Sequence, residues 1–234
     1  MKQIKTIAVK EFKDYFISPI AYIVIALFLI VTGWFFFSTF FIFGRADLRD
    51  FFALLPITFS FIIPAITMRL FSEEQNVGSY ETLLTMPVSF TDIAIGKFLA
   101  ATPFAAAMLF PTISYPLFIA LLGQIDPGPV IGGYLGAILL ASAYCAIGIF
   151  ASSLTRNQIV AFIIGCALCF TFTILDRLLF FMPAKIVNII SYIGANTHFT
   201  NISKGVIDSR DILYFISVIF IFIFSTYMVM DEKN

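Results

Sequence analysis

Long stretches without a charged side chain constrain this sequence more than any other feature. Four of them are bounded by the pairs Asp14 and Arg45, Lys97 and Asp126, Asp126 and Arg156, and Arg156 and Asp176. Each is long enough to cross a bilayer, which takes about 20 apolar residues in a helix. Only 12% of the residues are charged, whereas a soluble domain holds about 25%. A water-soluble globule is therefore excluded.

The apolar stretches predict an all-α polytopic membrane protein with a single transmembrane domain, residues 1–234. They are continuously apolar, which favours helices over the alternating pattern of a β-barrel. We expect six spans, at residues 20–43, 51–68, 98–122, 131–153, 158–179 and 211–230. An even number of spans places both termini on the same side of the membrane.

Lysine and arginine counts indicate which side that is, because cytoplasmic loops are enriched in both. One face would carry eight of them: Lys2, Lys5, Lys10, Lys13, Arg69, Lys97, Arg156 and Lys233. The other would carry six: Arg45, Arg49, Arg177, Lys185, Lys204 and Arg210. Four lysines precede the first span, so we expect both termini in the cytoplasm and the chain in a bacterial inner membrane, with no cleaved signal peptide.

Two stretches outside the spans have helical patterns. Residues 3–18 place apolar side chains on one face and lysines on the other, which predicts an amphipathic interfacial helix that ends before Pro19. In the polar stretch 69–97, we expect Gly78 to break the chain and a further helix to begin with Thr91 as its cap.

Prolines and glycines modify the third and fourth spans and the outer segment. Pro103, Pro111 and Pro116 should kink the third span, and Gly132 and Gly136 mark a close helix contact, within one subunit or between two. Residues 181–209 are apolar for a loop yet too broken to cross, which predicts two short re-entrant helices in the outer leaflet, at 184–193 and 197–207. Gly194 and Gly205 would allow turns at their C-terminal ends.

Residues suited to catalysis or metal binding are sparse. Cys145, Cys166 and Cys169 all lie within spans, where they are interpreted as packing residues. The single histidine, His198, is interpreted as a polar loop residue, and no set of residues suited to an intramembrane protease accompanies it. The sequence predicts no enzyme and no cofactor in this chain.

Energy for transport would have to come from elsewhere. Every charge lies at a span end, so no proton or sodium relay is visible, and no phosphate-binding loop occurs. The formal net charge of zero gives no basic field for nucleic acid.

Residues 69–97 resemble the cytoplasmic loop of ABC type 2 exporter permeases. The resemblance rests on Arg69, Ser72-Glu73-Glu74, the stretch from Gly78 to Ser89, and Gly96-Lys97-Phe98. Ser152 to Gln158, and His198-Phe199 with Gly205 to Asp208, are similar to the branch that includes gliding-motility and nitrous-oxide-reductase-maturation permeases.

The resemblance implies a permease that dimerises with a second copy or a paralogue and carries two ABC ATPase subunits, which bind ATP and Mg. Ser79 to Pro87 would form the coupling helix. Its apolar knob would be Tyr80, Leu83 and Leu84, its anchors Glu81, Glu73 and Glu74, with Arg156 beside them. For Glu73 and Glu74, simple hydration of a helix end is the alternative.

The outer segment would cap the exit of the dimer as an outer gate formed by Ala184, Ile193, Gly194, His198, Phe199 and Gly205. Membrane lipid and a periplasmic accessory protein are further expected partners. Two other functions are open: a secondary carrier or channel, and a membrane scaffold that recruits a cytoplasmic ATPase without transporting.

Overall fold

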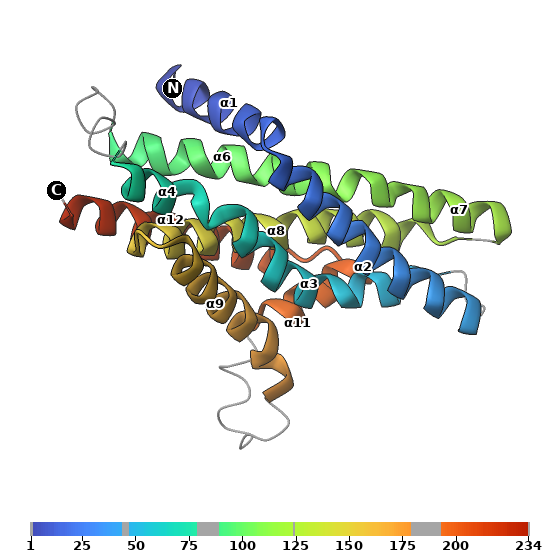
Figure 1. Ribbon diagram of the computed structural model, residues 1–234. Coiled ribbons are helices and arrows are strands. Elements are labelled where there is room, and N and C mark those ends of the chain that lie inside the picture. The colour runs from blue at the N-terminus through green and yellow to red at the C-terminus, as the bar shows by residue number, and fades with distance from the viewer. Residues whose placement is uncertain (1, 44–46, 79–88, 124, 179–192, 234) are drawn as a thin grey trace.

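The computed structural model describes residues 2–43, 47–78, 89–123, 125–178 and 193–233, drawn in colour in Figure 1. These residues form helices joined by turns, with no strand among them. The elements are α1 (Lys2–Ile17), α2 (Pro19–Phe43), α3 (Arg49–Thr67), α4 (Arg69–Val77), α6 (Phe90–Leu109), the 3-10 turn η1 (Phe110–Ile113), α7 (Ser114–Leu122), α8 (Pro127–Leu154), α9 (Gln158–Leu178), α11 (Ala195–Ser203) and α12 (Ser209–Glu232).

Six helical stretches in the described part of the chain are long and apolar enough to cross a membrane. They are Pro19–Ile42, Arg49–Val77, Phe90–Leu122, Pro127–Leu154, Gln158–Asp176 and Ser209–Glu232. The predicted all-helical fold with six spans is confirmed. The chain's two ends lie at the same end of the bundle, and α7 lies at the opposite end (Figure 1).

Helix α8 is the centre of the bundle, in contact with α3, α4, α6, α9, α11 and α12. Small residues make these close contacts possible. A Cβ added at Gly133 would overlap the Phe52 ring, and one at Gly132 would overlap the Ile202 carbonyl of α11. Gly136 faces the side chains of Ile202 and Phe199. The Gly132 and Gly136 pair therefore seats α11 within this chain, which settles the alternative left open by the sequence.

Local signals set most helix boundaries. Helix α1 ends at Ile17 and α2 begins at Pro19, as predicted. The third span is interrupted by η1, which begins one residue before Pro111, whereas Pro103 lies within α6 and Pro116 within α7. The cap of α6 was wrongly predicted. Ser89 caps it by accepting from the Asp92 amide at 3.2 Å, because its extended backbone (ψ 151°) lets the hydroxyl reach that amide.

A buried group of hydroxyls joins three spans. Ser60 of α3 lies 2.7 Å from the Thr173 hydroxyl of α9, which lies 2.5 Å from the Tyr144 hydroxyl of α8. In a membrane such bonds satisfy polar atoms that lipid cannot, so they fix how α3, α8 and α9 pack together.

Candidate functional site

Helix α4 continues the second span toward the predicted coupling segment, but it is a separate helix. Met68 ends α3 and begins α4. The Ser152 hydroxyl of α8 lies against this break, where it accepts from the amides of Phe71 at 3.0 Å and Ser72 at 3.1 Å. It also donates to the Met68 carbonyl at 2.7 Å. One side chain of α8 thus bonds to the backbone at the break and in the first turn of α4.

Gly148, one turn before Ser152, lets α8 approach this closely. A Cβ at Gly148 would overlap the Thr67 hydroxyl, which is fully buried at the end of α3. Residues four apart lie on one helix face, so Gly148 and Ser152 together form the surface of α8 on which the break rests. We call Met68, the first turns of α4, Ser152 and Lys97 the α4 joint.

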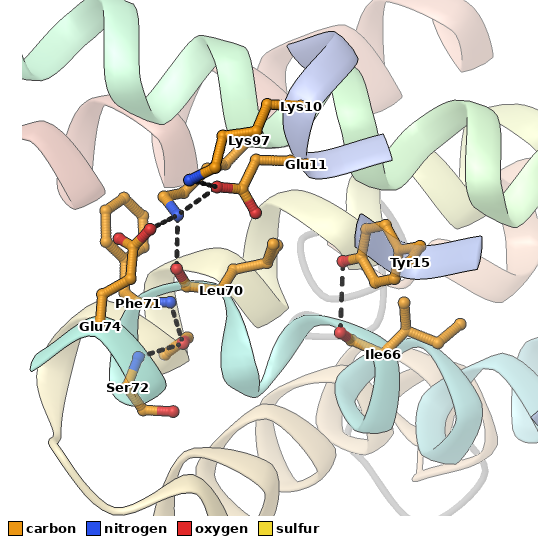
Figure 2. A network of polar contacts seen from close by, with 10 residues as sticks. Lys10, Glu11, Tyr15, Ile66, Leu70, Phe71, Ser72, Glu74 and Lys97 are labelled. Carbon is orange, nitrogen blue, oxygen red and sulfur yellow. Dashed lines mark hydrogen bonds and ion pairs between the residues drawn. The ribbon is translucent and has the colours of Figure 1, made fainter. Parts of the chain in front are cut away.

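Lys97 of α6 holds the joint from the other side, with only 1% of its side chain exposed. Its ammonium donates to the Leu70 carbonyl at 2.6 Å and pairs with Glu74 at 2.8 Å and with Glu11 of α1 at 3.3 Å (Figure 2). The Phe71 ring lies 5.0 Å away. A buried charge persists only when its donors are satisfied, and these acceptors come from both α4 and α1.

Helix α1 is fastened to the joint through Tyr15. Its hydroxyl donates to the Ile66 carbonyl at 3.3 Å (Figure 2), and its ring stacks on Phe104 at 4.7 Å. The Arg69 guanidinium lies 4.8 Å from the centre of the same ring. A Cβ at Gly96 would press on Ile7, which shows how closely α1 lies on α6. The predicted N-terminal helix is therefore packed on the bundle along one face.

A cavity of about 340 Å³ opens between α1 and α4. Four carboxylates and two cations line it, with three other residues: Lys10, Glu11, Asp14, Tyr15, Arg69, Leu70, Glu73, Glu74 and Val77. Glu11 and Glu74 pair with Lys97, whereas Asp14 and Glu73 are exposed. The exposed carboxylates suit a positively charged side chain of a partner.

The far side of α4 meets the end of α12. Gln75 donates to the Ser153 carbonyl at 3.2 Å. The Lys233 ammonium donates to the same carbonyl at 2.7 Å and to the Gln75 side chain at 3.3 Å. Burial, with the positive charge of Arg156 nearby, lowers the pKa of Lys233. Helices α4, α8 and α12 therefore end against one another.

The predicted coupling residues fall into three groups. Glu73 is exposed and Glu74 is half-buried in its pair with Lys97. Arg156 is exposed in the turn between α8 and α9. The other six lie outside the described residues: Ser79, Tyr80, Glu81, Leu83, Leu84 and Pro87. Gly78 ends α4 with φ 79°, a left-handed conformation that favours glycine, so the predicted break is present.

Sequence reasoning missed the residues that hold α4 in place. Lys97 entered as a charge at a span end and, like Ser152, as part of a resemblance, and Gly148 did not enter at all. The available signals were a lysine directly after Gly96 at the start of an apolar run, and small residues four apart on α8.

The predicted outer residues lie around α11. His198 and Phe199 are buried on it, Ile193 is exposed before it, and Gly205 follows it with φ 86°. Gly194 is the residue before α11, with φ −71°. Most of the predicted helix 184–193, which Gly194 was expected to end, lies outside the described residues. Ala184 lies outside the described residues.

His198 is not the loop residue that the sequence suggested. It lies in α11, and its Nδ1 is 2.6 Å from Oδ1 of Asp211 in the first turn of α12. Thirteen residues separate the two in the sequence, and only the turn between α11 and α12 brings them together.

Six apolar helices define a multi-pass membrane protein. The family model described as ABC-2 type transporter matches residues 2–176, about three quarters of the chain, and the chain belongs to this family. It is therefore a transmembrane permease component of an ABC transporter, in a family whose membrane domains work with an ABC ATPase and usually dimerise. A search of curated proteins found no match to the chain.

Proposed function

We propose that the chain is the permease subunit of an ATP-driven exporter, in which a separate ATPase acts on residues 79–88 and moves α4. The observation that carries the proposal is the α4 joint. Helix α4 leads from the second span to residue 79, and its backbone bonds to Ser152 of α8 and Lys97 of α6. A short helix bonded to two other helices can transmit force to both.

Movement would spread from α4 along two paths. The Ser152 contacts link α4 to α8, which touches every other span except the first among the described contacts. The Lys97 contacts link it to α6 and, through Glu11, to α1. Met68 is the pivot in this proposal, because the two helices meet there without a loop.

The ATPase would bind the surface formed by α1 and α4 through ion pairs. Asp14 and Glu73 are exposed at the cavity between α1 and α4, so arginine or lysine side chains of the ATPase are the expected partners. Glu74 already pairs with Lys97, and its contact with an ATPase stays a prediction. ATP and Mg would bind to the ATPase, in two copies for a dimer of this chain or of this chain with a paralogue.

The proposed orientation places both termini and α4 in the cytoplasm of a bacterial inner-membrane protein, on the strength of the N-terminal lysines. The outer segment would then control the exit, with α11 as its described part and a periplasmic accessory protein as a further partner. The resemblance supports the gliding-motility and nitrous-oxide-reductase-maturation branch.

Purification of the chain with an ABC ATPase tests the proposal. The permease in nanodiscs should bind the ATPase encoded beside it and raise its rate of ATP hydrolysis. A control variant, Arg49→Gln, removes an exposed charge at the start of α3, outside the outer segment, and should leave both unchanged. Binding without stimulation would favour a scaffold, and transport without any ATPase would favour a carrier or channel. Uptake into inside-out vesicles would establish export.

A further inference from the structure

Charged side chains from three helices meet where α11 is seated. His198 of α11 is 6% exposed and Asp211 of α12 is 4% exposed, and they pair at 2.6 Å. The Tyr214 ring stacks on His198 with 4.1 Å between ring centres, and its hydroxyl donates to the Ile193 carbonyl at 2.5 Å. The pair therefore fastens α11 to the first turn of α12.

Asp176 of α9 holds the same N-terminal end of α11, at the residue before His198. Its Oδ2 accepts from the Thr197 amide at 2.6 Å, so a carboxylate from another helix satisfies an amide of the first turn of α11. A Cβ at Gly194 would overlap this carboxylate, which explains the glycine there. Oδ1 of Asp176 and Oδ2 of Asp211 are buried without a hydrogen-bond partner among the described residues.

The charge of this group depends on one proton. A neutral imidazole gives Asp211 an uncharged partner, whereas an imidazolium forms a pair of opposite charges with it. The other helices that touch α11 bring no buried charge near it. Helix α8 faces it with Gly132 and Gly136, and the charged residues at the start of α3, Arg49 and Asp50, are exposed.

We propose that His198, Asp211 and Asp176 form a proton-dependent lock, in which protonation of His198 tightens the seating of α11 on α8, α9 and α12 and its loss loosens it. An imidazolium makes a charge-assisted bond to Asp211 that a neutral ring cannot make. This stabilisation needs the imidazolium and is lost when its proton leaves. The compartment at this end of the bundle therefore sets how firmly α11 is held.

Only the identity of that compartment rests on the proposed function. The lock itself needs neither ATP nor a substrate, so it can be tested on the full chain alone. A test that measures the seating of α11 directly also separates a failure of the lock from a failure of the transporter proposal.

The experiment measures how fast a water-soluble maleimide labels a cysteine in the seat. Ile202→Cys reports seating, because Ile202 is fully buried against Gly136. Val206→Cys, at a position 63% exposed, is the reference, and the ratio of the two rates removes the thiol's own pH dependence. The unsubstituted chain in detergent supplies the blank for Cys145, Cys166 and Cys169.

Between pH 5 and pH 8 the ratio should rise about fivefold, the difference between a charge-assisted and a neutral hydrogen bond. His198→Asn keeps a donor for Asp211 but cannot be charged, so its ratio should be high and independent of pH. The labelling ratio of Asp211→Asn should also be high and independent of pH. This variant replaces His198→Asn in the test if His198→Asn fails to fold. A ratio that is constant in the otherwise unsubstituted chain, or that rises equally in both variants, would overturn the proposal.

Discussion

Lys97 and Glu74 form an ion pair of 2.8 Å between α6 and α4, with 1% and 16% of their side chains exposed. The same lysine donates to the Leu70 carbonyl one turn before Glu74. This arrangement ties the helix that leads to the predicted coupling segment to a different span, and it explains why a lysine is tolerated in a buried position.

Removal of one partner of this pair should be costly. Lys97→Met leaves Glu74 and Glu11 without their cation and should lower stability by about 3–5 kcal/mol. Lys97→Met with Glu74→Gln should recover part of that loss. Thermal unfolding in detergent measures both, with the exposed Lys13→Met as the control. Equal stability of Lys97→Met and Lys13→Met would contradict a structural role for the pair.

Gly148→Ala should disturb the α4 joint by overpacking. The added methyl group would overlap the Thr67 hydroxyl, and such insertions cost about 1–3 kcal/mol. Thr67→Ala should restore most of the loss when the two are combined. Gly128→Ala is the control, because the atom nearest to its added Cβ, Oδ1 of Asp126, would lie at an ordinary contact distance of 3.4 Å. A double variant no more stable than Gly148→Ala would show that the contact is not the cause.

Ser152→Ala should loosen the joint without removing a span. It leaves the Phe71 and Ser72 amides without their Ser152 acceptor, at a cost of about 1–3 kcal/mol. Ser153→Ala is a matched control, because the Ser153 hydroxyl bonds only to the Phe150 carbonyl of its own helix among the described residues. Hydrogen exchange should show faster exchange in 69–77 for Ser152→Ala alone. Equal exchange in both variants would count against the joint.

Topology can be tested by cysteine accessibility in intact cells. Ser89→Cys lies at the start of α6 and Asn196→Cys in the first turn of α11. The proposed orientation predicts that an impermeant reagent labels Asn196→Cys directly and Ser89→Cys only after permeabilisation. Labelling of both from the same side would refute it.

The sequence was sufficient to predict features that depend on local composition. Charge-free runs gave the six spans, Pro19 gave the boundary between α1 and α2, and Pro111 gave the interruption of the third span. The structure corrected the cap of α6 from Thr91 to Ser89. Both residue types cap well, and backbone geometry rather than residue type decided between them.

The polar contacts could not be predicted, because each joins residues distant in the sequence. Ser152 meets the Phe71 amide across 81 positions, and Lys97 meets Glu11 across 86. A lysine at a span end is ordinarily solvated, so nothing in its local sequence distinguishes Lys97. The contact between His198 and Asp211 could not be predicted either, because it depends on how the chain turns between α11 and α12.

The most direct test of the account is the coupling of ATP hydrolysis to transport in proteoliposomes that contain this chain and its ATPase. Glu81→Arg, and Leu83→Asp with Leu84→Asp, should leave insertion and dimerisation intact. They place an unmatched charge in the proposed ATPase interface, which costs about 2–5 kcal/mol. The account predicts that both variants lose ATP-dependent transport, while Arg49→Gln keeps it. Unchanged ATP-dependent transport in both variants would contradict the claim that residues 79–88 receive the force of the ATPase.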